Sequence, residues 1–580
     1  MFITSGNGFA VLKRTVSVSA RNRRIIYSVK HINSYISKKS FLLPVCMLGM
    51  SIMLAACGGN TGEDGAKPSN NTAGTDSSQP FVFGETPLTF SFFGNYDWYT
   101  MNPWGQDPAT KWIQENKKVT VQSIQSGGAA LQKFNTMIAS GEFPDVIWGD
   151  RGAEVEKLRK AGKLVALDPY LDKYPNLKKW AGEKTINMLR SEDGKLYQFP
   201  NWYTKNPMGN GGYAVNNKIY KELGSPKLKT FDDLYAYLKL VKEKYPDIIP
   251  FEVGMLGQGI DFLYAGMAED RNVGQVSLRV VPQGNELKSL FSDPVYRETM
   301  VFANKLFREK LITQDAITQT RDQVKEKVNN GRIAVYGDFD TTVIGTEANS
   351  MLRAKDPEGG YTMIWPLHKA GVDPKKVWVN EFDSLGWNVS VITTQAENPE
   401  GIFAYLDWLT GEEGERIIFW GPEGMYWQGI NEKGAPIYTE KYKNEAEERS
   451  KLMAIWDTFQ WAGNTAFIDG AKAENEMSLP EDKRDWATVS QTTIAWKTSF
   501  DATEFGNIQP LPDSEEGMIM QRVADIADKV RAKALFAKDE QEVIALLDKA
   551  EQDAQKAGYD KLLKFETGKW QDNIKKIKGN

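Results

Sequence analysis

Aromatic rings and carboxylates gather where several predicted strands of this sequence end. Flat rings stack on C–H faces, and carboxylates accept hydrogen bonds from hydroxyl groups. This combination suits a polyhydroxylated ligand, whereas a phosphate or sulfate would favour arginines and helix N-termini. The candidate ligand-binding residues are Tyr96, Trp98, Trp148, Asp150, Trp202, Tyr203, Asp338, Phe339, Asp340, Asp383 and Trp387.

Not every tryptophan is expected at such a site. Trp408 and Trp420 occur at helical spacing among apolar residues, as do Trp112 and Trp180, so we expect these four rings to pack in cores. Trp98, Trp148 and Trp202 stand at strand ends, where we expect exposure to a cleft.

The elements that position these residues alternate between strands and helices. Residues 88–93, 119–124 and 145–148 read as strands, and 129–140 reads as a helix with Leu131, Phe134, Met137 and Ile138 on one face. Gly141 is placed to end that helix. The segment from 119 to 148 therefore predicts a βαβ unit with parallel strands, which is typical of α/β domains.

Cys57 is the residue whose chemistry is most sharply indicated. It follows Leu54, Ala55 and Ala56, and a positively charged, then apolar segment precedes it. The tetrapeptide resembles the lipobox of bacterial lipoproteins, which implies a signal peptide over 1–56, with an unusually long n-region, and a lipid on the Cys57 thiol. Residues 57–85 are dominated by small and polar types and predict a flexible tether.

Composition restricts the chemistry further. The net charge is −5, and residues 1–56 hold eight Lys or Arg and no acid, so the remainder is more acidic still and argues against a nucleic-acid partner. Of the two Cys, Cys46 precedes the cut and Cys57 is the lipid acceptor. His368 is the only His that follows Cys57, so we expect no His-rich metal site and no cofactor.

The sequence lacks the common catalytic motifs. It contains no phosphate-binding P-loop, no His-Glu-x-x-His, and no Gly-x-Ser-x-Gly after Cys57. An enzyme built from this chain would therefore depend on carboxylates, as a glycoside hydrolase does.

Several segments resemble family 1 extracellular solute-binding proteins, the lipoprotein receptors of carbohydrate ABC importers. Residues 131–147 look like the family's helix followed by Ala-Ser-Gly-x-x-Pro-Asp-Val. Thr230–Leu234 and Asn398–Glu400 open helices with capping residues, and 421–424 read Gly-Pro-Glu-Gly. The resemblance runs from about Leu88 to the C-terminus and is greatest to the larger, oligosaccharide-type members.

The resemblance implies an α/β fold of two lobes, the periplasmic-binding-protein-like type II fold, with the ligand in the cleft between them and C-terminal helices packed on the lobes. Pro200 and Gly337 are suitable hinge positions. We expect lobe 1 to comprise 86–200 and 338–387, lobe 2 to comprise 201–337 and 388–513, and the helical tail to comprise 514–580.

The function implied is that of a receptor rather than an enzyme. It would be a monomer, lipid-anchored on the extracytoplasmic face of a Gram-positive cell membrane, that captures a sugar or oligosaccharide by closure and delivers it to an ABC permease. Two alternatives remain open. One is a lipid-anchored polysaccharide-degrading enzyme, and the other is a sensor subunit that presents the same ligand to a membrane kinase.

Overall fold

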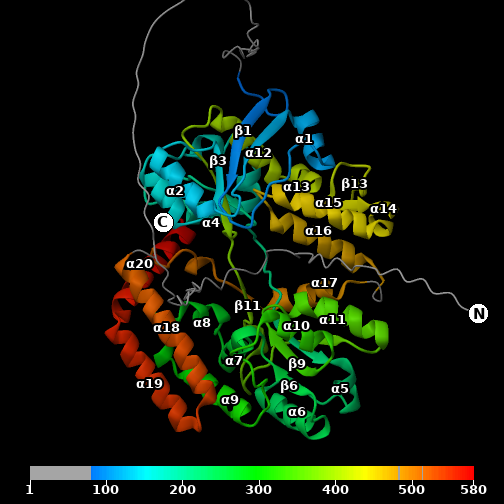
Figure 1. Ribbon diagram of the computed structural model, residues 1–580, viewed down its shortest axis with the longest axis vertical. Helices are drawn as coiled ribbons and strands as arrows, with labels where there is room; N and C mark the ends of the chain where they lie inside the picture. Colours follow the sequence, from blue (N-terminus) through cyan, green and yellow to red (C-terminus); the bar gives the residue numbers. More distant parts are fainter. Residues whose placement is uncertain (1–79, 481–483, 512–513, 580) are drawn as a thin grey trace, which may run out of the picture. The chain divides into compact units, whose positions relative to one another are not determined.

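Two β-sheets form the framework of the computed structural model, which describes residues 80–480, 484–511 and 514–579. The predicted signal peptide, Cys57 and most of the predicted tether lie outside these residues. Figure 1 shows β1 and β3 on one side of the short strand β11, and β6 and β9 on the other.

The first sheet has five strands in the order β2, β1, β3, β12, β4. They are β1 (Leu88–Gly94), β2 (Val119–Ile124), β3 (Val146–Asp150), β4 (Phe199–Asn201) and β12 (Asn388–Ile392). β2 and β3 both lie parallel to β1, and β12 is antiparallel to β3 and β4. The predicted parallel βαβ unit is therefore confirmed, with β1 between its two strands.

The helices around this sheet begin and end where the capping residues indicate. In α2 the C-cap Gly141 is left-handed, with φ of 75°, and donates its N–H to Met137. Phe134 is buried as predicted, but Leu131 is 62% exposed because it lies in the first turn, away from the sheet. The first-lobe helices are α1 (Pro108–Lys117), α2 (Ala130–Ser140), α3 (Ala153–Lys160), α4 (Asn176–Leu189), α12 (Pro399–Thr410), α13 (Glu412–Trp420), α14 (Glu440–Asn444), α15 (Ala446–Trp456) and α16 (Thr465–Ser478), with a hairpin of β13 (Trp427–Ile430) and β14 (Pro436–Tyr438).

The second sheet has four strands in the order β10, β5, β9, β6. They are β5 (Gly212–Asn216), β6 (Ile249–Glu252), β9 (Ile333–Asp338) and β10 (Tyr361–Ile364). β6 is parallel to β9, whereas β5 is antiparallel to both β9 and β10.

The predicted capping box of α6 is present in the second lobe. The Thr230 side chain accepts from the Asp233 N–H, and the Asp233 carboxylate accepts from the Thr230 N–H. The other second-lobe elements are α5 (Asn217–Glu222), α6 (Phe231–Lys244), α7 (Gly259–Met267), α8 (Val273–Leu278), α9 (Pro294–Arg308), α10 (Arg321–Asn329), α11 (Thr341–Lys355) and α17 (Trp486–Ser490), with a hairpin of β7 (Val280–Gln283) and β8 (Glu286–Ser289).

The strand pairing exchanges two segments between the expected lobes. From the sequence we expect 338–387 in lobe 1 and 388–513 in lobe 2. However, β10 pairs with β5 in the second sheet, and β12 pairs with β3 and β4 in the first. Gly337 lies inside β9 rather than at a crossing, whereas Pro200 lies in β4, where the first crossing begins. Antiparallel partners of this kind leave no local signal, because the pairing joins residues about 150 to 240 positions apart.

The crossing segments are tied to one another. β11 (Asn380–Phe382) pairs in parallel with β15 (Ser499–Asp501). Asn380 is buried and bonds both backbone groups of Gly211, at 2.8 and 3.0 Å, while its Nδ2 also donates to the Ala495 carbonyl at 3.3 Å. One side chain therefore ties β11 to the first crossing segment and to the segment that follows α17.

The C-terminal helices pack against the second lobe. They are α18 (Glu515–Phe536), α19 (Glu540–Lys556) and α20 (Tyr559–Lys578). Val543, Leu547 and Ala550 of α19 are buried on one face, in the core that α9 also enters. Within the described residues, no helix combines the length and the apolar character that crossing a membrane requires.

Candidate functional site

The carboxyl ends of β1 and β3 bring five aromatic rings together. Four of them were predicted as ligand-binding residues, and the fifth, Tyr99, follows in the same loop. The set, called the ring cluster here, consists of Tyr96, Trp98, Tyr99, Trp148 and Trp387. Trp387 joins because β12 begins at Asn388, which pairs with Asp150 at the end of β3.

The spacing of the rings decides where a ligand can lie. Centroid distances within the cluster run from 5.0 Å, between Tyr96 and Trp148, to 6.4 Å, between Trp98 and Trp387. These are contact distances for aromatic pairs, so a ligand cannot enter between the rings. Trp98 is 51% exposed and stacked on Tyr96, whereas Trp148 is 4% exposed. Trp98 therefore presents the outer face of the cluster. Trp148 is buried behind it, so the exposure expected for Trp148 is wrong, because Tyr96, Tyr99 and Trp387 pack around its ring.

Two carboxylates lie beside the ring cluster. The Tyr96 hydroxyl donates to Asp150 Oδ1 at 2.7 Å, and burial together with this carboxylate raises the pKa of Tyr96. Asn95 Nδ2 donates to Glu154 at 2.8 Å. Burial and the negative charge of Asp150 raise the pKa of Glu154. This edge of the first sheet thus combines exposed π surface with hydrogen-bond acceptors.

A second set of predicted residues lies where β9 ends. The Asp338 carboxylate is 4% exposed and accepts from the Tyr336 hydroxyl at 2.9 Å and from the Phe339 N–H at 2.7 Å. Burial, followed by the charge of Asp340, raises the pKa of Asp338 to about 7. Asp340 forms an ion pair of 2.5 Å with Arg321.

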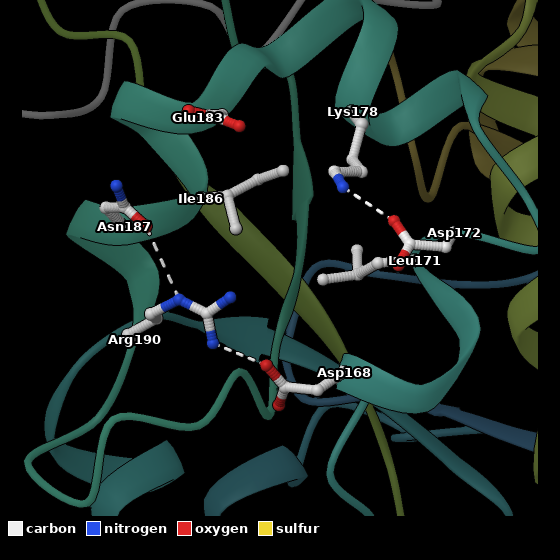
Figure 2. A pocket seen from close by; sticks show the side chains of 8 residues that line it. All are labelled: Asp168, Leu171, Asp172, Lys178, Glu183, Ile186, Asn187 and Arg190. Carbon is white, nitrogen blue, oxygen red and sulfur yellow. Dashed lines mark hydrogen bonds and ion pairs between the residues drawn. The ribbon is translucent and has the colours of Figure 1, made fainter. Parts of the chain in front are cut away.

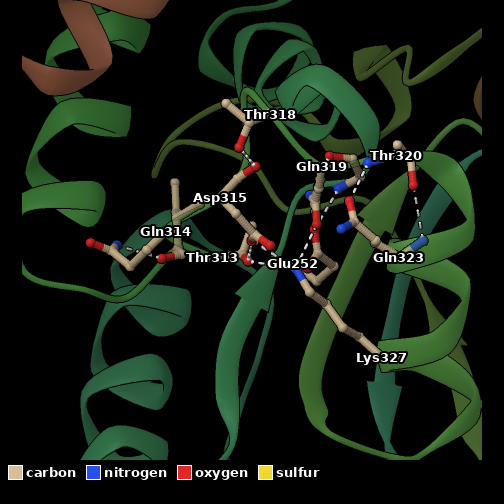
Figure 3. Close-up of polar contacts among 11 residues, drawn as sticks. Glu252, Thr313, Gln314, Asp315, Thr318, Gln319, Thr320, Gln323 and Lys327 are labelled. Carbon is tan, nitrogen blue, oxygen red and sulfur yellow. Dashed lines mark hydrogen bonds and ion pairs between the residues drawn. The ribbon is translucent and has the colours of Figure 1, made fainter.

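A polar network under this second set was not foreseen (Figure 3). Gln319 Nε2 donates to Glu252 Oε1 at 2.6 Å and to the Gly254 carbonyl at 2.8 Å, and Lys327 pairs with Glu252 at 3.2 Å. Gly254 has φ of 72°, and a Cβ there would lie 2.4 Å from Asp338 Cγ. The network therefore fixes the turn at Gly254, which packs directly against the Asp338 carboxylate. Its members come from separate elements, so no sequence spacing links them.

Both sets lie next to the first crossing segment. Asp150 pairs with Asn388, and Asn388 pairs with Asn201 at the end of β4. The chain then crosses to Gly212, which pairs with Asp338 at the end of β9. In open α/β sheets ligands bind beyond the carboxyl ends of strands, and here those ends in both lobes meet at the same crossing.

Two other predicted residues lie in packed surroundings. Tyr203 is fully buried, and its hydroxyl bonds Thr410 at 2.6 Å. This placement removes Tyr203 from the candidate ligand surface. Trp202 has a positive φ of 59° and packs edge-to-face on Phe419, with a centroid distance of 5.9 Å, in a core between α13 and α16. The turn that directs Trp202 into this core has no signature in its neighbours.

Asp383 is part of an ion pair at the second crossing. Arg151, directly after β3, pairs with Asp383 at 3.2 Å, and both side chains are nearly buried. The Leu385 N–H also donates to Asp383 at 3.0 Å. Through these contacts Asp383 ties the first lobe to a crossing segment.

A cavity of about 320 Å³ lies elsewhere, beside α4 (Figure 2). It contains none of the predicted ligand-binding residues, and its wall includes ion pairs of Arg190 with Asp168 and of Lys178 with Asp172. Within the described part of the chain, no group of three or more His, Cys, Asp or Glu is placed to hold a metal ion.

Comparison with known proteins identifies relatives of the chain. The family described as "Bacterial extracellular solute-binding protein" matches residues 100–416. The lipoprotein LipO of Bacillus subtilis is 29% identical over 41% of this chain and 47% of its own length. The polygalacturonan/rhamnogalacturonan-binding protein YtcQ of the same species is 22% identical over 72% of this chain and 80% of its own.

A third relative is also known as a structure. The fructooligosaccharide ABC transporter substrate-binding protein FusA of Streptococcus pneumoniae is 28% identical over 36% of this chain and 42% of its own length. Its structure with kestose superposes with a TM-score of 0.58 at 18% identity, covering 83% of this chain and 99% of FusA. The chain thus matches less than half of the length of LipO and of FusA by sequence, while the fold is shared over nearly the whole of FusA.

Proposed function

The chain belongs to the bacterial extracellular solute-binding proteins, and we propose that its solute is a sugar or oligosaccharide that it delivers to an ABC importer. The main observation behind this proposal is that Trp98 is half exposed and stacks on Tyr96, which belongs to the packed ring cluster. A flat, fixed ring beside carboxylate acceptors matches the alternating C–H faces and hydroxyls of a pyranose or furanose.

Capture by closure follows from the positions of the two sets. The ring cluster belongs to the first lobe, and Asp338, Phe339 and Asp340 belong to the second. A ligand that touches both sets stabilises the closed arrangement, and the crossing segments supply the hinge. A closed receptor with its ligand enclosed is then the form that a permease receives.

We further propose that the protein is a monomer held at the extracytoplasmic membrane face by a lipid on Cys57. The sequence before Cys57 supports this, as does the similarity to LipO, a lipoprotein. Two acyl chains provide stable attachment, since each buried methylene contributes about 0.8 kcal/mol.

Binding without chemistry distinguishes a receptor from a hydrolase. Mass spectrometry of the purified full-length protein should detect a bound saccharide. That saccharide should bind in a calorimetric titration and be recovered chemically unchanged afterwards. Release of new reducing ends from the saccharide would contradict the proposal and favour the enzyme instead.

Small-angle scattering tests closure in the same samples. Saturating saccharide should reduce the radius of gyration and raise the melting temperature through linkage. A scattering profile that is unchanged at saturation would show that the ligand binds without closure.

A further inference from the structure

The charges at the candidate site bear on which saccharides it can accept. The ligands named for two relatives differ in charge: fructooligosaccharide is neutral, and polygalacturonan carries a carboxylate on its sugar units. A site for the second kind needs cations that are free to meet those carboxylates.

The first lobe offers negative charge next to the exposed ring. Asp150 accepts the Tyr96 hydroxyl, and Glu154 lies close enough to Asp150 for the two charges to repel. Lys157 offsets part of this repulsion. The faces of aromatic rings are also electron-rich, so Trp98 favours C–H groups over anions.

The second lobe adds carboxylates on its side of the crossing. Asp338 and Asp340 are separated by one residue at the end of β9, and the charge of Asp340 makes the electrostatic potential at Asp338 more negative. Glu252 lies behind Asp338, although Lys327 pairs with it.

The two arginines at these strand ends are already paired. Arg151 contacts Asp383, and its side chain is only 8% exposed, so it lies away from any ligand on the surface. Arg321 is more exposed but contacts Asp340 at 2.5 Å. An anionic ligand would have to compete with a fixed carboxylate for either one.

We propose that this site selects uncharged oligosaccharides and rejects saccharides that carry carboxylates. This inference rests on the proposed function and narrows its substrate class. Neutral sugars supply the hydroxyl donors that the Asp and Glu side chains accept and the C–H faces that Trp98 stacks on. A uronic acid brings a carboxylate toward carboxylates at the edge of both lobes, where Arg151 and Arg321 each already contact a carboxylate of the protein.

Matched saccharide pairs provide the test. The full-length chain is titrated at pH 7.5 and low ionic strength with fructooligosaccharides, with oligogalacturonides, and with the same oligogalacturonides after reduction of their carboxyl groups to alcohols. The reduced oligomers keep the linkage and length of the originals, and a neutral CH2OH group replaces each carboxylate. We expect the reduced form to bind at least 100-fold more tightly than the acidic form.

Removing one carboxylate of the site tests directly whether charge sets the ratio of the two affinities. Asp340→Asn frees Arg321 and removes one carboxylate, and it should narrow the ratio between the reduced and acidic forms by at least ten-fold. Glu432→Gln, an exposed carboxylate in the turn between β13 and β14, is the matched control and should leave the ratio unchanged.

Each outcome bears on one claim. If the acidic oligomers bind as tightly as the reduced ones, or more tightly, the charge inference is overturned while the receptor function stands. If the ratio is unchanged in Asp340→Asn, the β9 carboxylates do not select the ligand and the inference is likewise overturned. If none of these saccharides binds and none co-purifies with the protein, the proposed function is wrong, and the inference that rests on it is wrong as well.

Discussion

At the scale of single residues, Trp98 and Trp148 have different roles in the same cluster. Trp98 is half exposed and has one face available, whereas Trp148 is enclosed by Tyr96, Tyr99 and Trp387. The first can contact a ligand directly, and the second can act only through the rings it supports.

Substitution should separate these two roles. Trp98→Ala should weaken saccharide binding by about 2 kcal/mol or more, the range of binding hot spots, with little change in the free energy of unfolding. Trp148→Ala should lower the free energy of unfolding by about 3–5 kcal/mol because it empties a packed position. Calorimetric titration and chemical denaturation of both variants measure the two effects. Wild-type affinity in Trp98→Ala would show that the ligand binds elsewhere on the protein.

Asp338 predicts a pH dependence of stability. Its folded pKa of about 7 lies above the ordinary value of about 3.9 for an unfolded Asp. Between those values the folded protein retains a proton that the unfolded chain releases, so this group lowers the free energy of unfolding as pH rises from about 4 to about 7. Each pKa unit of difference corresponds to about 1.4 kcal/mol.

The difference between wild type and Asp338→Asn isolates this contribution. Glu566 and Asp407 are also buried with raised pKa, and they contribute with the same sign to both proteins. Urea denaturation at a series of pH values should show the wild type losing stability relative to Asp338→Asn as pH rises. Parallel curves for the two proteins would mean that Asp338 is ionised in the folded state throughout this range.

At the scale of elements, the crossing segments depend on one buried amide. Asn380→Ala leaves both backbone groups of Gly211 without their partners, and an unpaired buried polar group costs about 1–3 kcal/mol. Because Gly211 belongs to the first crossing segment and Ala495 to the segment that follows α17, we expect this variant to change both the free energy of unfolding and the saccharide affinity.

Asn398→Ala is the matched control for Asn380→Ala. Asn398 caps α12 by accepting from the Gly401 N–H at 2.8 Å, and its removal should cost about 1 kcal/mol of stability. Denaturation and titration of the two variants should show that only Asn380→Ala alters affinity. An affinity unaffected by Asn380→Ala would place the hinge motion outside the segment that this side chain ties together.

At the scale of the whole molecule, attachment is expected to depend on Cys57. Cys57→Ser removes the thiol that would accept the lipid, so the protein should appear in the culture medium or accumulate as an uncleaved precursor. Detergent phase separation and the mass of the processed chain report the two fates. Wild-type processing and partition into detergent by Cys57→Ser would exclude the lipid anchor at this position.

The sequence by itself was sufficient to predict those structural features that depend on neighbouring residues. The helix start at Thr230, the helix end at Gly141 and the parallel strands around residues 119 to 148 are all found as predicted. Capping and periodicity act within a few residues, so the chain specifies the helix ends and the strand positions locally. The parallel direction of the strands follows from the helix that connects them. The same locality explains why the sequence places Tyr96 and Trp98 just after β1, and Trp148 and Asp150 at the end of β3. Their contact with a ligand stays a prediction.

Only the tertiary structure decided which segment belongs to which lobe and which rings face outward. β12 returns to the first sheet and β10 joins the second because they pair with strands far away in the sequence. Tyr203 occurs beside Trp202 in the same predicted loop, yet it is fully buried against Thr410. Likewise Glu252, Gln319 and Lys327 become neighbours only when β6, the loop before α10 and α10 itself converge. Burial and long-range pairing are properties of the assembled chain, because they depend on which surfaces other segments cover.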